Sequence, residues 1–196
     1  MKHWRNKGIS FEIEVAKFLT RWAKASLNDT SLPEKLFWRG VGSGSSLKHN
    51  PSVVLFHGDV VPIHPSVYPF GEIVYVECKR WKTIDVLSLL DNKRQQDIAS
   101  FGKVLLNAFH CAANMNKILW FIVKRNYTRD CLLFTPSKHL THIDLQNKVD
   151  CMILSLRNTE FLIIPLQQFL RVVSYSEFIS IHKTNKTQVK EGVHDK

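Results

Sequence analysis

One short segment, residues 73–79, constrains the fold more than any other part of the chain. Its sequence is Ile-Val-Tyr-Val-Glu-Cys-Lys, and β-branched and aromatic side chains in such a run are typical of a buried strand. Residues two apart in a strand point to the same face, so Glu77 and Lys79 project together while Cys78 points away. A carboxylate and an ammonium are costly to bury unless they serve each other or a metal. The segment therefore predicts a central strand with a charged site at its end.

Helical and strand patterns alternate on either side of this segment. Apolar residues recur at helical spacing over residues 9–25 and 86–113, which predicts two amphipathic helices. Shorter apolar runs predict further strands, at residues 36–41, 53–56, 60–63, 118–123 and 131–135. Helices interleaved with strands in this way cover the faces of a mixed sheet. We therefore predict an α/β fold in which a mixed central β-sheet is flanked by helices, in the order αβββαβ.

The pattern changes after residue 135. Residues 152–156 and 160–164 predict a hairpin, and two short helices are expected at 167–172 and 176–181. The expected division of the chain is a core at residues 1–135, a C-terminal extension packed on it at 136–181, and a disordered basic tail at 182–196.

The chain carries a large positive charge. Its 196 residues include 27 Lys and Arg against 17 Asp and Glu, a net charge of +10. This excess favours a polyanionic partner, with nucleic acid first and an anionic membrane surface second. No apolar run reaches the roughly 20 residues that span a bilayer, so we expect no membrane insertion. The four widely spaced cysteines and the absence of a secretory signal indicate a reducing, cytoplasmic location without zinc ribbons or disulfides.

Asp59 is a second carboxylate that could join the charged strand. It follows Gly58 at the start of a short strand candidate, although Gly-Asp is also a common turn pair. Two carboxylates and a carbonyl oxygen suit a hard cation such as Mg²⁺. Phosphodiester hydrolysis needs this set, because a divalent ion offsets the charge that develops on the phosphate and lowers the pKa of an attacking water. Lys79 could orient or deprotonate that water, or contact the scissile phosphate.

Asp59 followed by Glu77-Cys78-Lys79 resembles the D…(D/E)-x-K signature of the PD-(D/E)XK nucleases, which share the restriction-endonuclease-like fold. Within that superfamily the chain is most similar to the archaeal and phage Holliday junction resolvases. Lys7-Gly8-x-x-Phe11-Glu12 resembles the opening of their first helix, and Arg39 with Ser43-Gly44-Ser45 resembles their R…SG stretch. The similarity covers residues 7–135, with Gly58 standing where the family usually has proline.

The resemblance implies a metal site and its chemistry. Its ligands would be Glu12, Asp59, Glu77 and the carbonyl oxygen of Cys78, with Lys79 as the catalytic base or a phosphate contact. The cofactor would be Mg²⁺, with Mn²⁺ able to substitute. Glu14 competes with Glu12 for the role on the first helix, but it lies further round the helix, where it is expected to pair with Lys17.

The resemblance also implies how DNA is held. The expected DNA contacts are Arg39, Ser43, Ser45, Arg80, Lys82 and Gln95. A resolvase would act on branched DNA as a symmetric homodimer, because two equivalent strands of a four-way junction need two sites. The relatives point to a prokaryotic, phage or other viral context.

Other interpretations remain open from the sequence. A restriction- or repair-type endonuclease would use the same residues on duplex or flap DNA. A nucleic-acid-binding module could keep the fold without cutting, and Glu77 and Lys79 would then be a salt bridge on a solvated face. The joint presence of Asp59, Glu77 and Lys79 disfavours this last hypothesis, because a module released from catalysis need not retain them.

Overall fold

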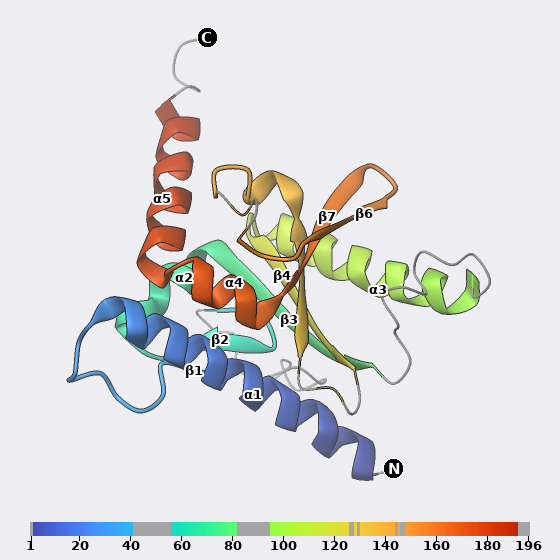
Figure 1. Ribbon diagram of the computed structural model, residues 1–196, viewed down its shortest axis with the longest axis horizontal. Helices are drawn as coiled ribbons and strands as arrows, with labels where there is room; N and C mark the ends of the chain where they lie inside the picture. The colour runs from blue at the N-terminus through green and yellow to red at the C-terminus, as the bar shows by residue number, and fades with distance from the viewer. Residues whose placement is uncertain are drawn as a thin grey trace.

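A mixed β-sheet lies between helices on both of its faces (Figure 1). The computed structural model describes residues 2–40, 56–81, 95–125, 128, 130–143, 145 and 148–191. The helices are α1 (Lys2–Leu27), α2 (Tyr68–Ile73), α3 (Gln95–Asn114), α4 (Leu166–Val172) and α5 (Tyr175–Glu191), with 3-10 turns at Pro65–Val67 and Ser137–His139.

Five strands form the main sheet, in the order β3-β4-β5-β7-β6. They are β3 (Val74–Trp81), β4 (Ile118–Arg125), β5 (Cys131–Pro136), β6 (Met152–Leu156) and β7 (Thr159–Pro165). β3 and β4 run parallel, and every other neighbouring pair is antiparallel. The predicted α/β class with a mixed central sheet is therefore confirmed, and the arrangement matches a restriction-endonuclease-like fold.

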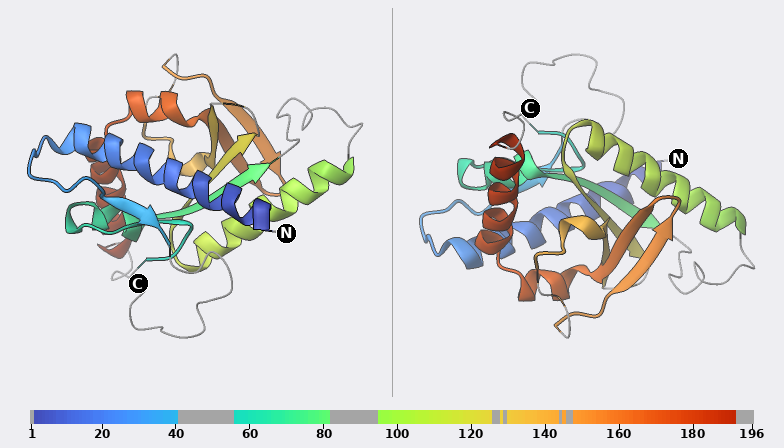
Figure 2. Two further views of the ribbon diagram at one scale, coloured as in Figure 1. Left: turned by 90° about the horizontal axis from the view of Figure 1, so that it is seen from below. Right: turned by 90° about the horizontal axis from the view of Figure 1, so that it is seen from above.

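The two faces of the sheet bury separate hydrophobic clusters. The alternation along β4 shows why: Trp120 and Ile122 point to one cluster, and Phe121 and Val123 to the other. The first cluster is covered by α1, α2, α4 and α5, and we call this side the α1 face. The second is covered by α3, and we call it the α3 face. Figure 2 shows α3 apart from the other helices, on its own side of the sheet.

A second, smaller sheet sits beside β3. Its strands β1 (Phe37–Arg39) and β2 (Val60–Pro62) are antiparallel, and an isolated parallel bridge joins Gly58 to Val76 of β3. α1 contacts β1, β2 and β3, so the helix covers this junction. The segment before β2 is thereby fixed against the middle of β3.

Aromatic rings fill the α1 face. Trp120 is fully buried, and its ring lies within 5.8 Å, centroid to centroid, of those of Trp22, Phe70, Phe169 and Phe178. The indole N–H of Trp22 donates to the backbone oxygen of Val173 over 2.7 Å, which ties α1 to the connection between α4 and α5. Aromatic pairs of this geometry stabilise a core beyond their buried area.

The C-terminal part, expected as an extension, lies within the main sheet and its core. β7 pairs with β5 on one side and β6 on the other, and Phe178 of α5 is fully buried. The structure differs from the disordered tail predicted from residue 182, because α5 continues as helix to Glu191. The predicted hairpin and both helices of this part are present, whereas residues 53–55 and 86–94 of two predicted elements lie outside the described residues.

Phe178→Ala tests whether α5 belongs to the core. The fully buried ring contacts four aromatic residues, so its loss should lower the free energy of unfolding by about 3–5 kcal/mol. Urea unfolding followed by circular dichroism measures the change. Ile153→Ala is the control: this side chain is 62% exposed, and its loss should cost under about 0.5 kcal/mol. A cost for Phe178→Ala as small as the control's would show that α5 is not part of the core.

Candidate active site

The alternation of β3 sets the directions of its charged residues. Val76 and Cys78 belong to the α1 face, whereas Tyr75 packs against the cluster of the α3 face. Glu77 and Lys79 share the parity of Tyr75, and the Tyr75 hydroxyl donates to Glu77 Oε2 over 3.0 Å. The predicted joint projection of Glu77 and Lys79, opposite to Cys78, is therefore observed.

Backbone geometry around Gly58 positions Asp59. Gly58 has φ +125°, and a Cβ there would lie 2.6 Å from the Val76 carbonyl oxygen. Only glycine tolerates both conditions, and proline, whose ring fixes φ near −65°, could not stand here. The Asp59 N–H donates to the Val76 oxygen over 2.7 Å, and the Cys78 N–H donates to Asp59 Oδ2 over 2.8 Å. These two hydrogen bonds hold the Asp59 carboxylate directly against β3.

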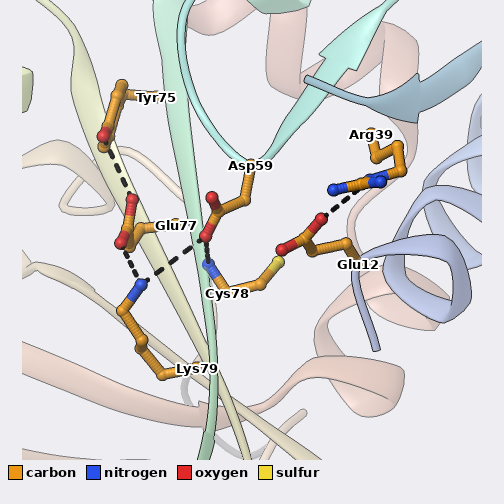
Figure 3. Close-up of polar contacts among 7 residues, drawn as sticks. All are labelled: Glu12, Arg39, Asp59, Tyr75, Glu77, Cys78 and Lys79. Carbon is orange, nitrogen blue, oxygen red and sulfur yellow. Dashed lines mark hydrogen bonds and ion pairs between the residues drawn. The ribbon is translucent and has the colours of Figure 1, made fainter. Parts of the chain in front are cut away.

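Lys79 joins the two carboxylates. Its ammonium lies 3.8 Å from Asp59 Oδ2 and forms an ion pair with Glu77 Oε1 (Figure 3). Asp59 and Glu77 are 18 residues apart in the sequence, yet both contact the Lys79 ammonium. The side chains of Asp59 and Glu77 are 8% and 17% exposed, so the group is largely shielded from water.

The group formed by Asp59, Glu77 and Lys79 has more negative than positive charge. Burial, with the nearby charges of Glu77 and Glu12, raises the pKa of Asp59 to about 7, against the opposing effect of Lys79 and the Cys78 N–H. Burial alone would lower the pKa of Lys79, but Glu77 and Asp59 outweigh it and raise that pKa. Lys79 is therefore a stable ammonium, and one positive charge balances two buried carboxylates only in part.

Glu12 approaches from α1. It is 8% exposed, and its Oε2 accepts a hydrogen bond from Arg39 Nε over 3.1 Å. In Figure 3, Asp59 lies between Glu77 on one side and Glu12 on the other. The charge of Glu12 raises the pKa of Asp59, so the two carboxylates lie close enough to interact without direct contact. Glu12 is therefore buried where α1 meets the sheet, with Arg39 as its partner.

The donor atoms suit a hard cation in kind. Asp59 Oδ1 and Glu12 Oε1 accept no hydrogen bond from a described residue, so each retains a carboxylate oxygen open to a ligand. Within the described part of the chain, however, no three His, Cys, Asp or Glu side chains converge as a metal-binding set. The Lys79 ammonium lies between Asp59 and Glu77 and contacts both carboxylates. The structure thus brings the predicted ligands close together. The side chains of Asp59 and Glu77 meet at the Lys79 ammonium and do not converge as a metal-binding set.

The remaining predicted contacts are placed in part. Arg80 is exposed on β3 beside the site, and Gln95 begins α3. Ser43, Ser45 and Lys82 lie outside the described residues.

Two contacts were not anticipated from the sequence. Glu14 pairs with Lys124 of β4 over 2.5 Å, so the expected pairing with Lys17 is wrong. Tyr75, which holds Glu77, was also missed. Its position two residues before Glu77 on the same strand face was the available signal.

The mixed sheet, with Asp59, Glu77 and Lys79 beside one another at β3, has the arrangement expected for the PD-(D/E)XK superfamily. A family model matches residues 3–189, and the chain belongs to that family, described as "Phage putative PDDEXK endonuclease". The match includes β6, β7, α4 and nearly all of α5, so the C-terminal part is common to the family. Searches of curated proteins and of solved structures gave no match. Among the described helices, none is long and apolar enough to cross a membrane.

The raised pKa of Asp59 predicts a pH-dependent stability. Between about pH 4 and pH 7 the folded protein keeps a proton on Asp59 that the unfolded chain has released, so stability falls as the pH rises through this window. Asp59→Asn removes this titration but keeps an oxygen that can accept from the Cys78 N–H. Its advantage over the wild type should grow with pH from near zero at pH 4 to on the order of 4 kcal/mol at pH 7.5.

Urea unfolding in EDTA at both pH values measures this difference. Glu34→Gln, at an exposed position, is the control and should show no such pH dependence. An Asp59→Asn variant that is less stable than the wild type at pH 7.5 would contradict the assigned electrostatics.

Proposed function

We propose that this protein is a Mg²⁺-dependent DNA endonuclease that hydrolyses phosphodiester bonds, with Asp59, Glu77 and Lys79 at its centre. The observation that carries the proposal is that Asp59, just before β2, and Glu77 of β3 both contact the Lys79 ammonium, with their side chains 8% and 17% exposed. Partly buried charges of this kind lower the stability of the fold, and they cluster at catalytic and binding sites. Membership of an endonuclease family supports the same activity.

Asp59, Glu77, Glu12 and the Cys78 carbonyl oxygen would hold the Mg²⁺ ion. When bound, this ion offsets the charge of the phosphate and lowers the pKa of an attacking water. The Cys78 N–H fixes the orientation of Asp59, and the Tyr75 hydroxyl fixes that of Glu77. Arg39 holds Glu12 at the α1 side of the site.

Lys79 acts as a charged donor in this proposal. Its raised pKa keeps it protonated at neutral pH, so it donates hydrogen bonds and does not accept a proton. Once the carboxylates are occupied by a cation, the ammonium is free to contact the scissile phosphate or orient the water.

Branched DNA is the proposed substrate, and a homodimer the proposed active form. The net charge of +10 supports binding to the DNA backbone, and the exposed Arg80 lies directly beside the site. Arg39, Ser43, Ser45, Lys82 and Gln95 would extend these contacts. Their order in the sequence resembles that of the Holliday junction resolvases.

Asp59→Asn and Glu77→Gln should each reduce DNA cleavage by at least about a hundredfold, because each removes a charge at the proposed cation site. DNA binding should change by less than about threefold, since the basic surface is untouched. Single-turnover cleavage and fluorescence anisotropy measure the two effects. Glu34→Gln, which removes an exposed carboxylate elsewhere, should cleave like the wild type. Undiminished cleavage by either site variant would refute this site.

Substrate choice distinguishes the proposed resolvase activity from its alternative. A four-way junction, a linear duplex and a single strand of matched sequence are each incubated with Mg²⁺ or with EDTA. We expect Mg²⁺-dependent paired nicks in the junction, because two symmetric sites can engage it. Equal cutting of the linear duplex would support a restriction- or repair-type endonuclease. Binding without any cleavage would support a module that does not cut.

A further inference from the structure

A polar cavity lies apart from the proposed active site, between the β6–β7 hairpin and α3. Its volume is about 490 Å³, within the range of small-molecule pockets. Its walls come from the hairpin turn, the end of β5 and the middle of α3, which Figures 1 and 2 show close together. β5, β7 and β6 are two to four strands from β3, so the cavity is separated from Glu77 by at least about 10 Å across the sheet.

Two cations line this cavity without carboxylate partners. Lys138 follows β5, and Arg157 lies at the hairpin turn. Neither forms a salt bridge with any carboxylate that the structure describes, although Glu160 is part of the same wall. The proposed active site is different, since Arg39 and Lys79 each form a salt bridge with a carboxylate there. Two positive charges that line the same cavity, those of Lys138 and Arg157, favour the binding of an anion there.

Hydroxyl groups complete the polar wall. Ser137, Ser155 and Thr159 line the cavity, and none of their hydroxyls is hydrogen-bonded to a described residue. A phosphate offers several acceptor oxygens, and hydroxyls and cations together are the donors that proteins use to bind it. The donor set therefore suits a phosphate ester better than a carboxylate or an uncharged ligand.

An aromatic ring forms the apolar wall. Phe109 of α3 is half-buried, and its ring is held edge-on to Phe161 of β7 with centroids 5.7 Å apart. A base can stack on such a ring, and the interaction tolerates any base because each has a π-face. Cations and hydroxyls beside an aromatic wall match a nucleotide, which has a phosphate at one end and a base at the other.

The frame of the cavity is fixed by regular structure. Leu156 pairs with Thr159, and Ser155 pairs with Glu160, so the hairpin register sets the wall residues on either side of the turn. Arg157 takes φ +53° at that turn. The hairpin also packs on α3, where Gly102 faces Leu156. The cavity is therefore largely pre-formed.

We propose that this cavity binds a nucleotide through its phosphate, with Lys138 and Arg157 as the charge partners and Phe109 beneath the base. The source of the nucleotide is either a free nucleoside monophosphate or the 5′-phosphorylated end of a DNA strand. The binding is independent of cleavage at Asp59, Glu77 and Lys79.

The test is a titration of ¹⁵N-labelled full-length protein with dTMP, followed by amide chemical shifts. dTMP should cause saturable shifts at residues 137–138 and 155–160, inorganic phosphate should bind the same amides more weakly, and thymidine should leave them unmoved. The double variant Lys138→Gln with Arg157→Asn should weaken dTMP binding at least about tenfold. Asparagine tolerates the positive φ at position 157, so the turn is preserved.

The matched control removes two exposed charges elsewhere, by Lys103→Gln with Arg171→Gln, and should bind dTMP like the wild type. A 5′-phosphorylated oligonucleotide that binds more tightly than dTMP identifies a strand end as the source, and weaker binding identifies the free nucleotide. The proposal is overturned if dTMP shifts no amide saturably, if thymidine binds equally, or if both double variants lose affinity alike. Asp59→Asn should leave dTMP binding intact. A loss of cleavage in this variant is therefore distinguished from a loss of dTMP binding.

Discussion

The hydrogen bond from the Cys78 N–H to Asp59 Oδ2 is the constraint on which the site depends. It connects the segment before β2 to the middle of β3 across 19 residues of sequence, and it brings Asp59 to the same ammonium as Glu77. The close approach at Gly58 makes this bond possible, since any side chain there would strike the Val76 carbonyl. The replacement of the family's usual proline by glycine thus corresponds to a backbone conformation that proline cannot adopt.

The fold supplies rigidity on both sides of this bond. The aromatic cluster around Trp120 fixes α1 and α5 against the α1 face, and α3 closes the other face through a separate cluster. Charged groups that are only partly neutralised destabilise a folded chain, and a large packed core can offset that cost. The packed core therefore supplies the stability that the partly neutralised charges of the site take away.

The sequence predicted those features that depend on local pattern. The period of two in β3 predicted where Glu77, Cys78 and Lys79 point, and the helical spacing of apolar residues predicted α1. Long-range pairing was less accessible. Glu14 meets Lys124 across 110 residues, so a local rule assigned it the wrong partner. The position of β7 between β5 and β6 was missed for the same reason, because strand order is set by tertiary packing and not by the pattern within a strand.

The proposed function requires Asp59 and Glu77 to share one cation-binding position, at the place where both contact the Lys79 ammonium. Anomalous diffraction from crystals soaked in Mn²⁺ measures this directly. We expect one strong anomalous peak within bonding distance of both carboxylates, with the Lys79 ammonium displaced from between them. Well-ordered crystals with the peak elsewhere, or with Lys79 still bridging Asp59 and Glu77 at saturating Mn²⁺, would contradict it.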